Sequence, residues 1–250
     1  RYSPFPEEMN RQLTGRIAEL HFAPTRRARE NLARENVTEN VYVVGNTVID
    51  ALHQMVHDAY RFHSPELAAL DLSQGRWIVM TAHRRENLGE HLEAICRGVL
   101  RLVAEHPDVH LVYPVHPNPA VRSVAEGVLG GHDRVHLIQP VEVEDMHNLM
   151  KRCYMVMTDS GGLQEEAPAL GKPVVVLRTE TERPEVVEAG MALLAGVEEQ
   201  HVYEAGERLL TDAQLYHAMA HAINPYGDGH TAEKIAQILL DWGRARRKRP

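Results

Sequence analysis

The residues best suited to chemistry lie in residues 158–168, which read Thr-Asp-Ser-Gly-Gly-Leu-Gln-Glu-Glu-Ala-Pro. The apolar run from Tyr154 to Met157 before them is typical of the end of a buried strand, and helical spacing follows the glycines. A strand, a glycine turn and a helix start together suit an anion, because the first helical N–H groups lack intrahelical partners and the helix dipole favours negative charge. Gly161 and Gly162 let the backbone approach a phosphate closely.

Two carboxylates, Glu165 and Glu166, follow about one turn inside the helix predicted here. A carboxylate at that place suits a neutral diol such as a ribose rather than the phosphate itself. The alternative is an ordinary connection between a strand and a helix, with Ser160 as the N-cap and an acidic first turn. The residues of this stretch alone leave both interpretations open.

A second polar cluster, residues 83–86 with the sequence His-Arg-Arg-Glu, follows the apolar strand predicted for residues 77–81. Histidine titrates near neutral pH, so His83 beside Arg84 and Arg85 could transfer protons or bind a phosphate. Guanidinium groups offer forked donors to a diphosphate or a carboxylate. The alternative is a solvated loop with an internal arginine–glutamate pair.

Three predicted strands end in polar residues, namely His83, His116 and the pair Asp159–Ser160. In open α/β sheets, ligands bind outside the carboxyl ends of the strands. If these strands are neighbours, the three clusters lie along one edge of the sheet. Their combination favours a nucleotide-sized site over coincidence.

The composition is that of a soluble globular protein, with 44% apolar and 25% charged residues in 250. We find neither an apolar run of the roughly 20 residues needed to span a bilayer nor a signal peptide. The net charge of -8 argues against general nucleic-acid binding. Cys96 and Cys153 form neither a disulfide framework nor a zinc site. We therefore predict a cytoplasmic protein that uses no metal or other cofactor and binds neither membranes nor nucleic acid.

Motifs that are absent narrow the function further. The sequence has no Gly-x-x-x-x-Gly-Lys-Ser/Thr and no Gly-x-Gly-x-x-Gly, which disfavours a nucleoside triphosphatase and a dinucleotide enzyme. It also lacks Gly-x-Ser-x-Gly, so Ser160 is a poor candidate for a nucleophile.

The elements that must position these residues alternate between strands and helices, which predicts a parallel α/β sheet. The predicted strands are residues 17–23, 41–46, 77–81, 109–115, 135–138, 154–157 and 174–177. A helix is predicted to start near Pro6, with Glu7 and Glu8 in its first turn. The other predicted helices are residues 26–35, 47–60, 92–106, 144–151, 165–170, a short one after 185 and 232–242. Between residue 185 and the final helix, the remaining chain is predicted to be helical. A short helical piece is expected within residues 61–75.

Six motifs resemble those of the non-hydrolysing UDP-N-acetylglucosamine 2-epimerases, in the family's order and over essentially the whole chain. They are residues 4–11, 44–50, 83–87, 159–168, 181–185 and 224–229. The resemblance implies a glycosyltransferase-B-like α/β fold, with parallel sheets in two Rossmann-like domains and the active site in the cleft between them. It implies that residues 1–44 end the first domain, residues 45–225 form the UDP-binding second domain, and residues 226–250 cross back to the first.

Members of this family interconvert UDP-N-acetylglucosamine and UDP-N-acetylmannosamine. They eliminate UDP in the anti sense, which gives 2-acetamidoglucal, and then add UDP back to this intermediate. By the resemblance, Glu7 is an acid/base carboxylate and His83 assists departure of the diphosphate. The substrate-binding residues that it implies are Ser160 and Gly161 at the phosphates, Gly162, Glu166 at the ribose, and Arg183.

The resemblance also bears on regulation and assembly. Arg84 and His116 match positions that, in some bacterial members, contact a second UDP-N-acetylglucosamine acting as an allosteric activator. A homodimer and a role in polysaccharide biosynthesis are further expectations from the family.

The chain departs from the family pattern at its start. A further catalytic Asp and Glu and a phosphate-binding Arg precede residues 4–11 in the family, and this sequence begins at Arg1. We therefore expect this polypeptide to bind UDP weakly and not to epimerise. Two alternatives stay open: a UDP-sugar glycosyltransferase of the same fold, and a non-catalytic regulator that binds UDP-sugars.

Overall fold

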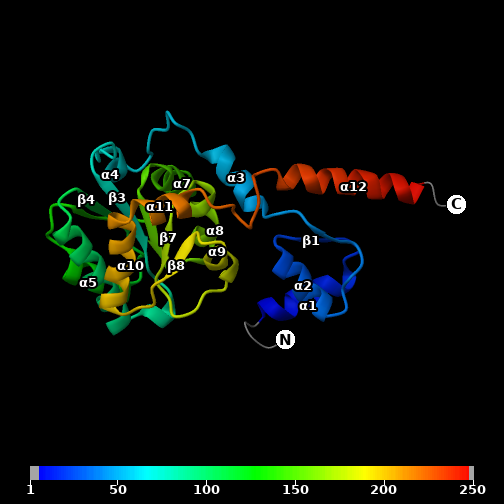
Figure 1. The fold of residues 1–250 in the computed structure, drawn as a ribbon, viewed down its shortest axis with the longest axis horizontal. Coiled ribbons are helices and arrows are strands. Elements are labelled where there is room, and N and C mark those ends of the chain that lie inside the picture. The colour runs from blue at the N-terminus through cyan, green and yellow to red at the C-terminus, as the bar shows by residue number, and fades with distance from the viewer. Residues whose placement is uncertain (1–5, 248–250) are drawn as a thin grey trace. The chain divides into compact units, whose positions relative to one another are not determined.

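The computed structural model describes residues 6–247, so Pro4 and Phe5 of the first motif lie outside the described residues. The chain divides into two compact units, each with its own elements (Figure 1). One unit combines the chain up to Ala51 with the chain from Pro225, and the other spans Leu52–Asn224. The sequence analysis expected domains to change after residues 44 and 225, whereas the compact units change after residues 51 and 224.

The larger unit contains a six-stranded parallel sheet with the order β5-β4-β3-β6-β7-β8. Its strands are β3 Arg76–Thr81, β4 Val109–Pro114, β5 Val135–Ile138, β6 Met155–Thr158, β7 Val174–Val176 and β8 Ala192–Leu194. Strands β3, β4, β6 and β7 are almost wholly buried, as expected for apolar runs covered on both faces. This strand order is that of a Rossmann fold, and it reverses between β3 and β6. The polar residues after β3 and β6 therefore lie at the place where such folds bind ligands.

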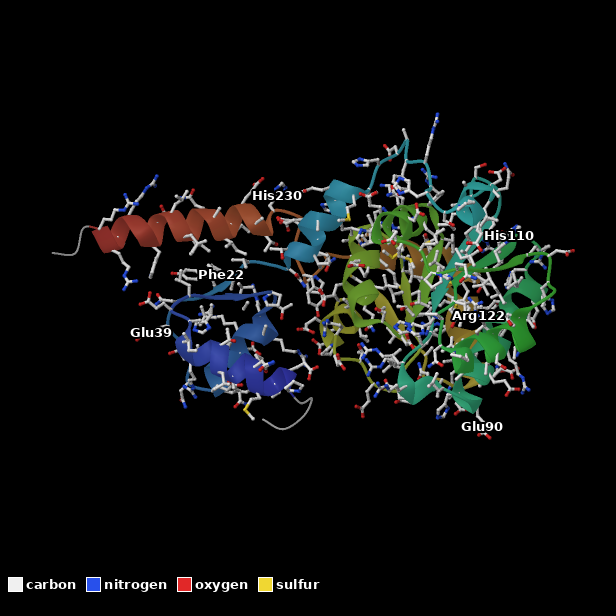
Figure 2. The ribbon with its side chains drawn as sticks, turned by 180° about the vertical axis from the view of Figure 1, so that it is seen from behind. Phe22, Glu39, Glu90, His110, Arg122 and His230 are labelled. Carbon is white, nitrogen blue, oxygen red and sulfur yellow. The ribbon has the colours of Figure 1, made fainter. Side chains whose placement is uncertain are left out.

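Helices connect these strands in the alternating pattern that the sequence predicts. They are α4 Pro65–Ala68, α5 Glu90–Glu105, α6 Pro119–Leu129, α7 Val143–Arg152, α8 Gly161–Ala169, α9 Pro184–Glu188, α10 Glu199–Thr211 and α11 Ala213–Ala220, with a 3-10 turn η1 at Arg85–Asn87. In Figure 2, Glu90 marks the start of α5 and Arg122 lies on α6. Within residues 6–247, no helix is long and apolar enough to cross a bilayer.

The smaller unit is built on two short parallel strands, β1 His21–Ala23 and β2 Val41–Val43. Its helices are α1 Glu7–Ile17, α2 Arg26–Arg34 and α12 Thr231–Arg247, and α3 Thr47–Met55 begins in it. The Thr25 hydroxyl accepts a hydrogen bond from the Ala28 N–H and so caps the start of α2. Asp50 Oδ1 accepts the Ala232 N–H at 2.7 Å, and this bond links the start of α12 to α3.

Some predicted element boundaries were wrong. The strand predicted from residue 17 begins at His21, because Ile17 ends α1 and is 83% exposed. The helix predicted over residues 47–60 ends at Met55. The helix predicted from Glu165 begins four residues earlier, at Gly161.

Two elements were missed. Helix α6 begins where the Asn118 side chain accepts the Ala120 N–H and Pro119 occupies the first turn, and it buries Val121, Ala125 and Leu129 at helical spacing. No element had been predicted between the strand ending at residue 115 and the strand beginning at residue 135. Strand β8 lies in a stretch predicted to be helical. It has three residues and is recognisable only by its pairing with β7.

Helices α5 and α10 pack side by side at glycines (Figure 1). A Cβ atom on Gly98 of α5 would lie 2.6 Å from the carbonyl oxygen of Glu199. A Cβ atom on Gly206 of α10 would lie 2.3 Å from Leu102 Cδ1. The small residues thus allow a close approach of two helices that cover the sheet.

This packing predicts opposite effects of the same substitution at two helical glycines. Gly98→Ala should destabilise the larger unit by about 1–3 kcal/mol, because its methyl group meets backbone that cannot move freely. Gly127→Ala in α6 is the control, since nothing lies within 4 Å of its Cβ position, and it should stabilise by about 0.5–1 kcal/mol. Urea unfolding of both variants measures the difference. Equal free energies of unfolding for Gly98→Ala and Gly127→Ala would contradict the close packing of α5 against α10.

Candidate functional site

The three polar clusters that follow β3, β4 and β6 lie along one edge of the sheet, because these strands are neighbours. The rings of His83 and His116 are stacked, with centroids 5.3 Å apart and an interplanar angle of 5°. His83 is also 3.5 Å from Asp159, measured from Nδ1 to Oδ1. The prediction that His83, His116 and the Asp159–Ser160 pair share one edge is confirmed.

The carboxylate of Asp159 holds the loop after β3. It is fully buried, and its Oδ2 accepts hydrogen bonds from the backbone N–H groups of His83 and Arg84 at 2.8 and 2.7 Å. The Asn87 side-chain amide donates to the same oxygen at 3.1 Å. Asp159 was expected at this edge of the sheet, but its binding of the loop after β3 was not predicted. A lone acidic residue immediately after an apolar strand was the signal that could have identified it.

The start of helix α8 offers an anion site. Ser160 occupies the N-cap with extended backbone, and no side-chain hydrogen bond caps the helix within the described chain. A Cβ atom on Gly161 would lie 3.8 Å from the Nη2 atoms of both Arg84 and Arg183. Two guanidinium groups therefore flank first-turn N–H groups that carry the positive end of the helix dipole.

The glycine pair differs in conformation from the prediction. Gly161 and Gly162 are the first two residues of α8 rather than a separate turn before it. Ser160 ends the extended segment instead, and its N–H donates to the Thr158 hydroxyl at 2.9 Å. Gly161 provides the absence of a side chain beside the guanidinium groups of Arg84 and Arg183.

Arg183 is fixed to α8 by its neighbours. Its Nε donates to Oε1 of Glu165, whose side chain is only 5% exposed. Its backbone N–H donates to the Thr181 hydroxyl at 3.0 Å, and that hydroxyl donates to the Gln164 side chain. Glu165 therefore orients an arginine, a role that the sequence analysis did not assign.

Glu166 points to a different neighbour. Its side chain is 14% exposed, and Oε2 lies 3.4 Å from Nε2 of the buried His147 on α7. Glu7 lies in the smaller unit, exposed in the first turn of α1. No group of three or more His, Cys, Asp or Glu side chains in residues 6–247 is placed to hold a metal ion.

Comparison with known sequences identifies the family. A sequence model described as UDP-N-acetylglucosamine 2-epimerase matches residues 1–240. The chain belongs to this family. A Thermotoga maritima protein is 58% identical over 240 residues, which cover 96% of this chain and 64% of that protein. The Bacillus subtilis UDP-N-acetylglucosamine 2-epimerase is 52% identical over 242 residues, covering 96% and 62%.

Solved structures of family members have the same fold. The S. aureus MnaA–UDP co-structure is 49% identical with a TM-score of 0.89, and the match covers 100% of this chain and 68% of that one. A Neisseria meningitidis UDP-GlcNAc 2-epimerase bound to UDP-GlcNAc is 40% identical with a TM-score of 0.82, covering 96% and 66%. These matches confirm the predicted α/β, glycosyltransferase-B-like fold class. The chain spans 62–64% of the length of the first curated relatives that it matches.

The bonds of Asp159 predict a measurable cost of removing its carboxylate. Asp159→Ala should lower the free energy of unfolding by about 3 kcal/mol, because two backbone N–H groups and an amide lose a charged acceptor. Asp159→Asn retains an acceptor oxygen and should cost less. Asp133→Ala, at an exposed carboxylate, is the control and should change little. The free energies of unfolding are measured with urea. If Asp159→Ala is as stable as Asp133→Ala, the carboxylate of Asp159 does not hold the loop.

Proposed function

We propose that this chain is the UDP-binding part of an enzyme that epimerises UDP-N-acetylglucosamine at C2 to UDP-N-acetylmannosamine. The observation that carries the proposal is the pair of guanidinium groups, from Arg84 and Arg183, beside the start of α8. Family membership supports it, and so do solved structures of relatives that contain UDP or UDP-GlcNAc.

The diphosphate would lie at the N-terminus of α8. Ser160, Gly161 and Gly162 would offer backbone N–H groups, and Arg183 would add forked donors suited to phosphate oxygens. His83 lies at the same edge of the sheet, on the loop that Asp159 holds. A positive or proton-donating group at that place would assist departure of UDP, since negative charge accumulates on the leaving phosphate.

The ribose would lie further along α8. Glu166 follows the helix start by five residues, or about 7.5 Å along the axis. A carboxylate there can accept hydrogen bonds from both hydroxyls of a diol while staying clear of the phosphates. This arrangement separates the cationic and the anionic parts of the site along one helix.

The reaction would proceed by anti elimination and re-addition. A carboxylate takes the proton from C2, and the bond between C1 and the phosphate oxygen breaks. The products of this step are UDP and 2-acetamidoglucal. Return of a proton to the opposite face of C2, with re-addition of UDP at C1, gives the epimer. Glu7 is the carboxylate of this chain proposed for such proton transfer, and the further carboxylates of the family precede the motif that contains it.

Arg84 and His116 remain candidates for contact with a second UDP-N-acetylglucosamine. His116 stacks directly on His83, and Arg84 shares the surroundings of Gly161 with Arg183. An activator bound to these residues would therefore touch the same groups as the substrate diphosphate. Homodimerisation stays a prediction from the family resemblance.

Binding of UDP by the 250-residue chain tests the nucleotide site. Isothermal titration calorimetry should give weak binding, and Arg183→Gln should weaken it about tenfold, because a charged hydrogen-bond donor to phosphate is lost. Arg208→Gln, at an exposed arginine of α10, is the control and should bind like the unchanged chain. The unchanged chain should not convert UDP-N-acetylglucosamine. Equal affinity of both variants would remove Arg183 from the site, and turnover by the bare chain would contradict the role given to upstream residues.

Catalysis is testable in a polypeptide of the relatives' full length that contains this sequence. Glu7→Gln and His83→Asn should each remove most of the epimerase rate in a coupled assay, because each deletes a proposed proton-transfer or charge-stabilising group. His201→Gln, at an exposed histidine of α10, should keep the rate. Near-normal activity of Glu7→Gln would exclude it from catalysis.

The same assay separates the alternative functions. UDP-N-acetylglucosamine incubated without an acceptor should be epimerised at C2. Slow hydrolysis or no reaction would favour a glycosyltransferase of the same fold. Binding without turnover in the longer polypeptide would favour a non-catalytic regulator.

A further inference from the structure

Helix α7 buries the polar side chains of Asp145, His147 and Asn148. Two of them, Asp145 and Asn148, have structural roles. Asp145 accepts hydrogen bonds from the Tyr60 hydroxyl and from the N–H groups of His63 and Ser64. Asn148 accepts the N–H of His57 and donates to the carbonyl oxygens of Met55 and Glu144. Both side chains therefore anchor the segment that leads into the sheet.

The third buried polar side chain, His147, does not bind that segment. It is 3% exposed, and its Nε2 lies 3.4 Å from Oε2 of Glu166 on the neighbouring helix α8. Its Nδ1 is buried and has no hydrogen-bond partner among the described residues. A buried imidazole needs a reason to be there, since an unpaired polar group in the interior is costly.

We propose that His147 is a positioning residue that fixes the Glu166 carboxylate for the ribose diol. The inference rests on the proposed function, in which Glu166 binds the ribose. A neutral imidazole carries one proton, and placing it on Nε2 gives Glu166 a donor. The unpartnered Nδ1 then holds a lone pair, so no N–H is left buried without an acceptor.

The geometry explains why such a donor is useful. A distance of 3.4 Å is longer than a fully formed hydrogen bond, and contacts of this kind often tighten when substrate binds. Holding Oε2 restricts rotation of the carboxylate and leaves Oε1 to accept from the ribose hydroxyls. His147 would therefore act on recognition of the diol without touching the nucleotide.

The difference in affinity between a nucleotide with the ribose diol and one without it distinguishes positioning of Glu166 from a role of His147 in core packing. Calorimetry compares UDP with 2′,3′-dideoxy-UDP, which keeps the base and the diphosphate and lacks both hydroxyls. His147→Phe keeps a ring of similar size and removes the donor. It should weaken UDP binding by about fivefold to tenfold and leave the dideoxy nucleotide unchanged. His147→Gln keeps an N–H donor and should recover most of the affinity for UDP.

The results separate failure of the inference from failure of the proposed function. If Glu166→Gln abolishes the preference for UDP while His147→Phe retains it, the positioning role is wrong and the ribose role of Glu166 stands. If His147→Phe weakens both nucleotides equally, His147 acts through packing alone and the inference is overturned. If the unchanged chain shows no preference for UDP, the ribose role of Glu166 fails and the inference fails with it.

The protonated nitrogen can be observed without any ligand. Long-range ¹H–¹⁵N spectra of the 250-residue chain, assigned with the His147→Phe variant, should show His147 with its proton on Nε2. A proton on Nδ1 would overturn the proposal, because Glu166 would then face a lone pair. His201, exposed on α10, provides the reference signal of a solvated histidine.

Discussion

The buried carboxylate of Asp159 is the contact on which the rest of the site depends. It lies immediately after β6 and binds the backbone of the loop after β3 through His83 and Arg84. These two strands are the pair between which the strand order reverses. Parallel strands bring their carboxyl ends together but leave the loops beyond them undetermined, so an additional contact must set the loop geometry. A buried charge with several donors is well suited to this, because it can be satisfied only in one arrangement.

Acidic residues orient the cationic ones throughout the site. Asp159 accepts hydrogen bonds from the backbone N–H groups of His83 and Arg84, and Glu165 binds the guanidinium group of Arg183. The protein as a whole carries a net charge of -8, so its general field does not attract an anion. Local placement of guanidinium groups at a helix N-terminus must provide that attraction instead. In the proposed site the arginines would attract a diphosphate, and the carboxylate of Glu165 is turned toward one of them, Arg183.

The gathering of His83, His116 and Asp159 could be predicted from the sequence, because continuous apolar runs marked the strands and polar residues marked their ends. For α8, the interpretation with Ser160 as the N-cap is confirmed, whereas the helix range that began at Glu165 was wrong, since Gly161 and Gly162 have low helix propensity and yet form its first turn. Strand β8 depends on pairing with β7, and three residues carry no period of their own. The partners of Glu165 and Glu166 were also beyond the sequence, because Arg183 and His147 approach from other elements.

The two adjacent glutamates show why residue type alone could not assign the site. Glu165 and Glu166 are neighbours in sequence, yet successive residues of a helix point about 100° apart, so they meet different surroundings. Glu165 pairs with the guanidinium group of Arg183. Glu166 instead lies beside the imidazole of His147, with Oε2 3.4 Å from Nε2. The difference between the two carboxylates therefore comes from their neighbours, His147 on α7 and Arg183 just before α9.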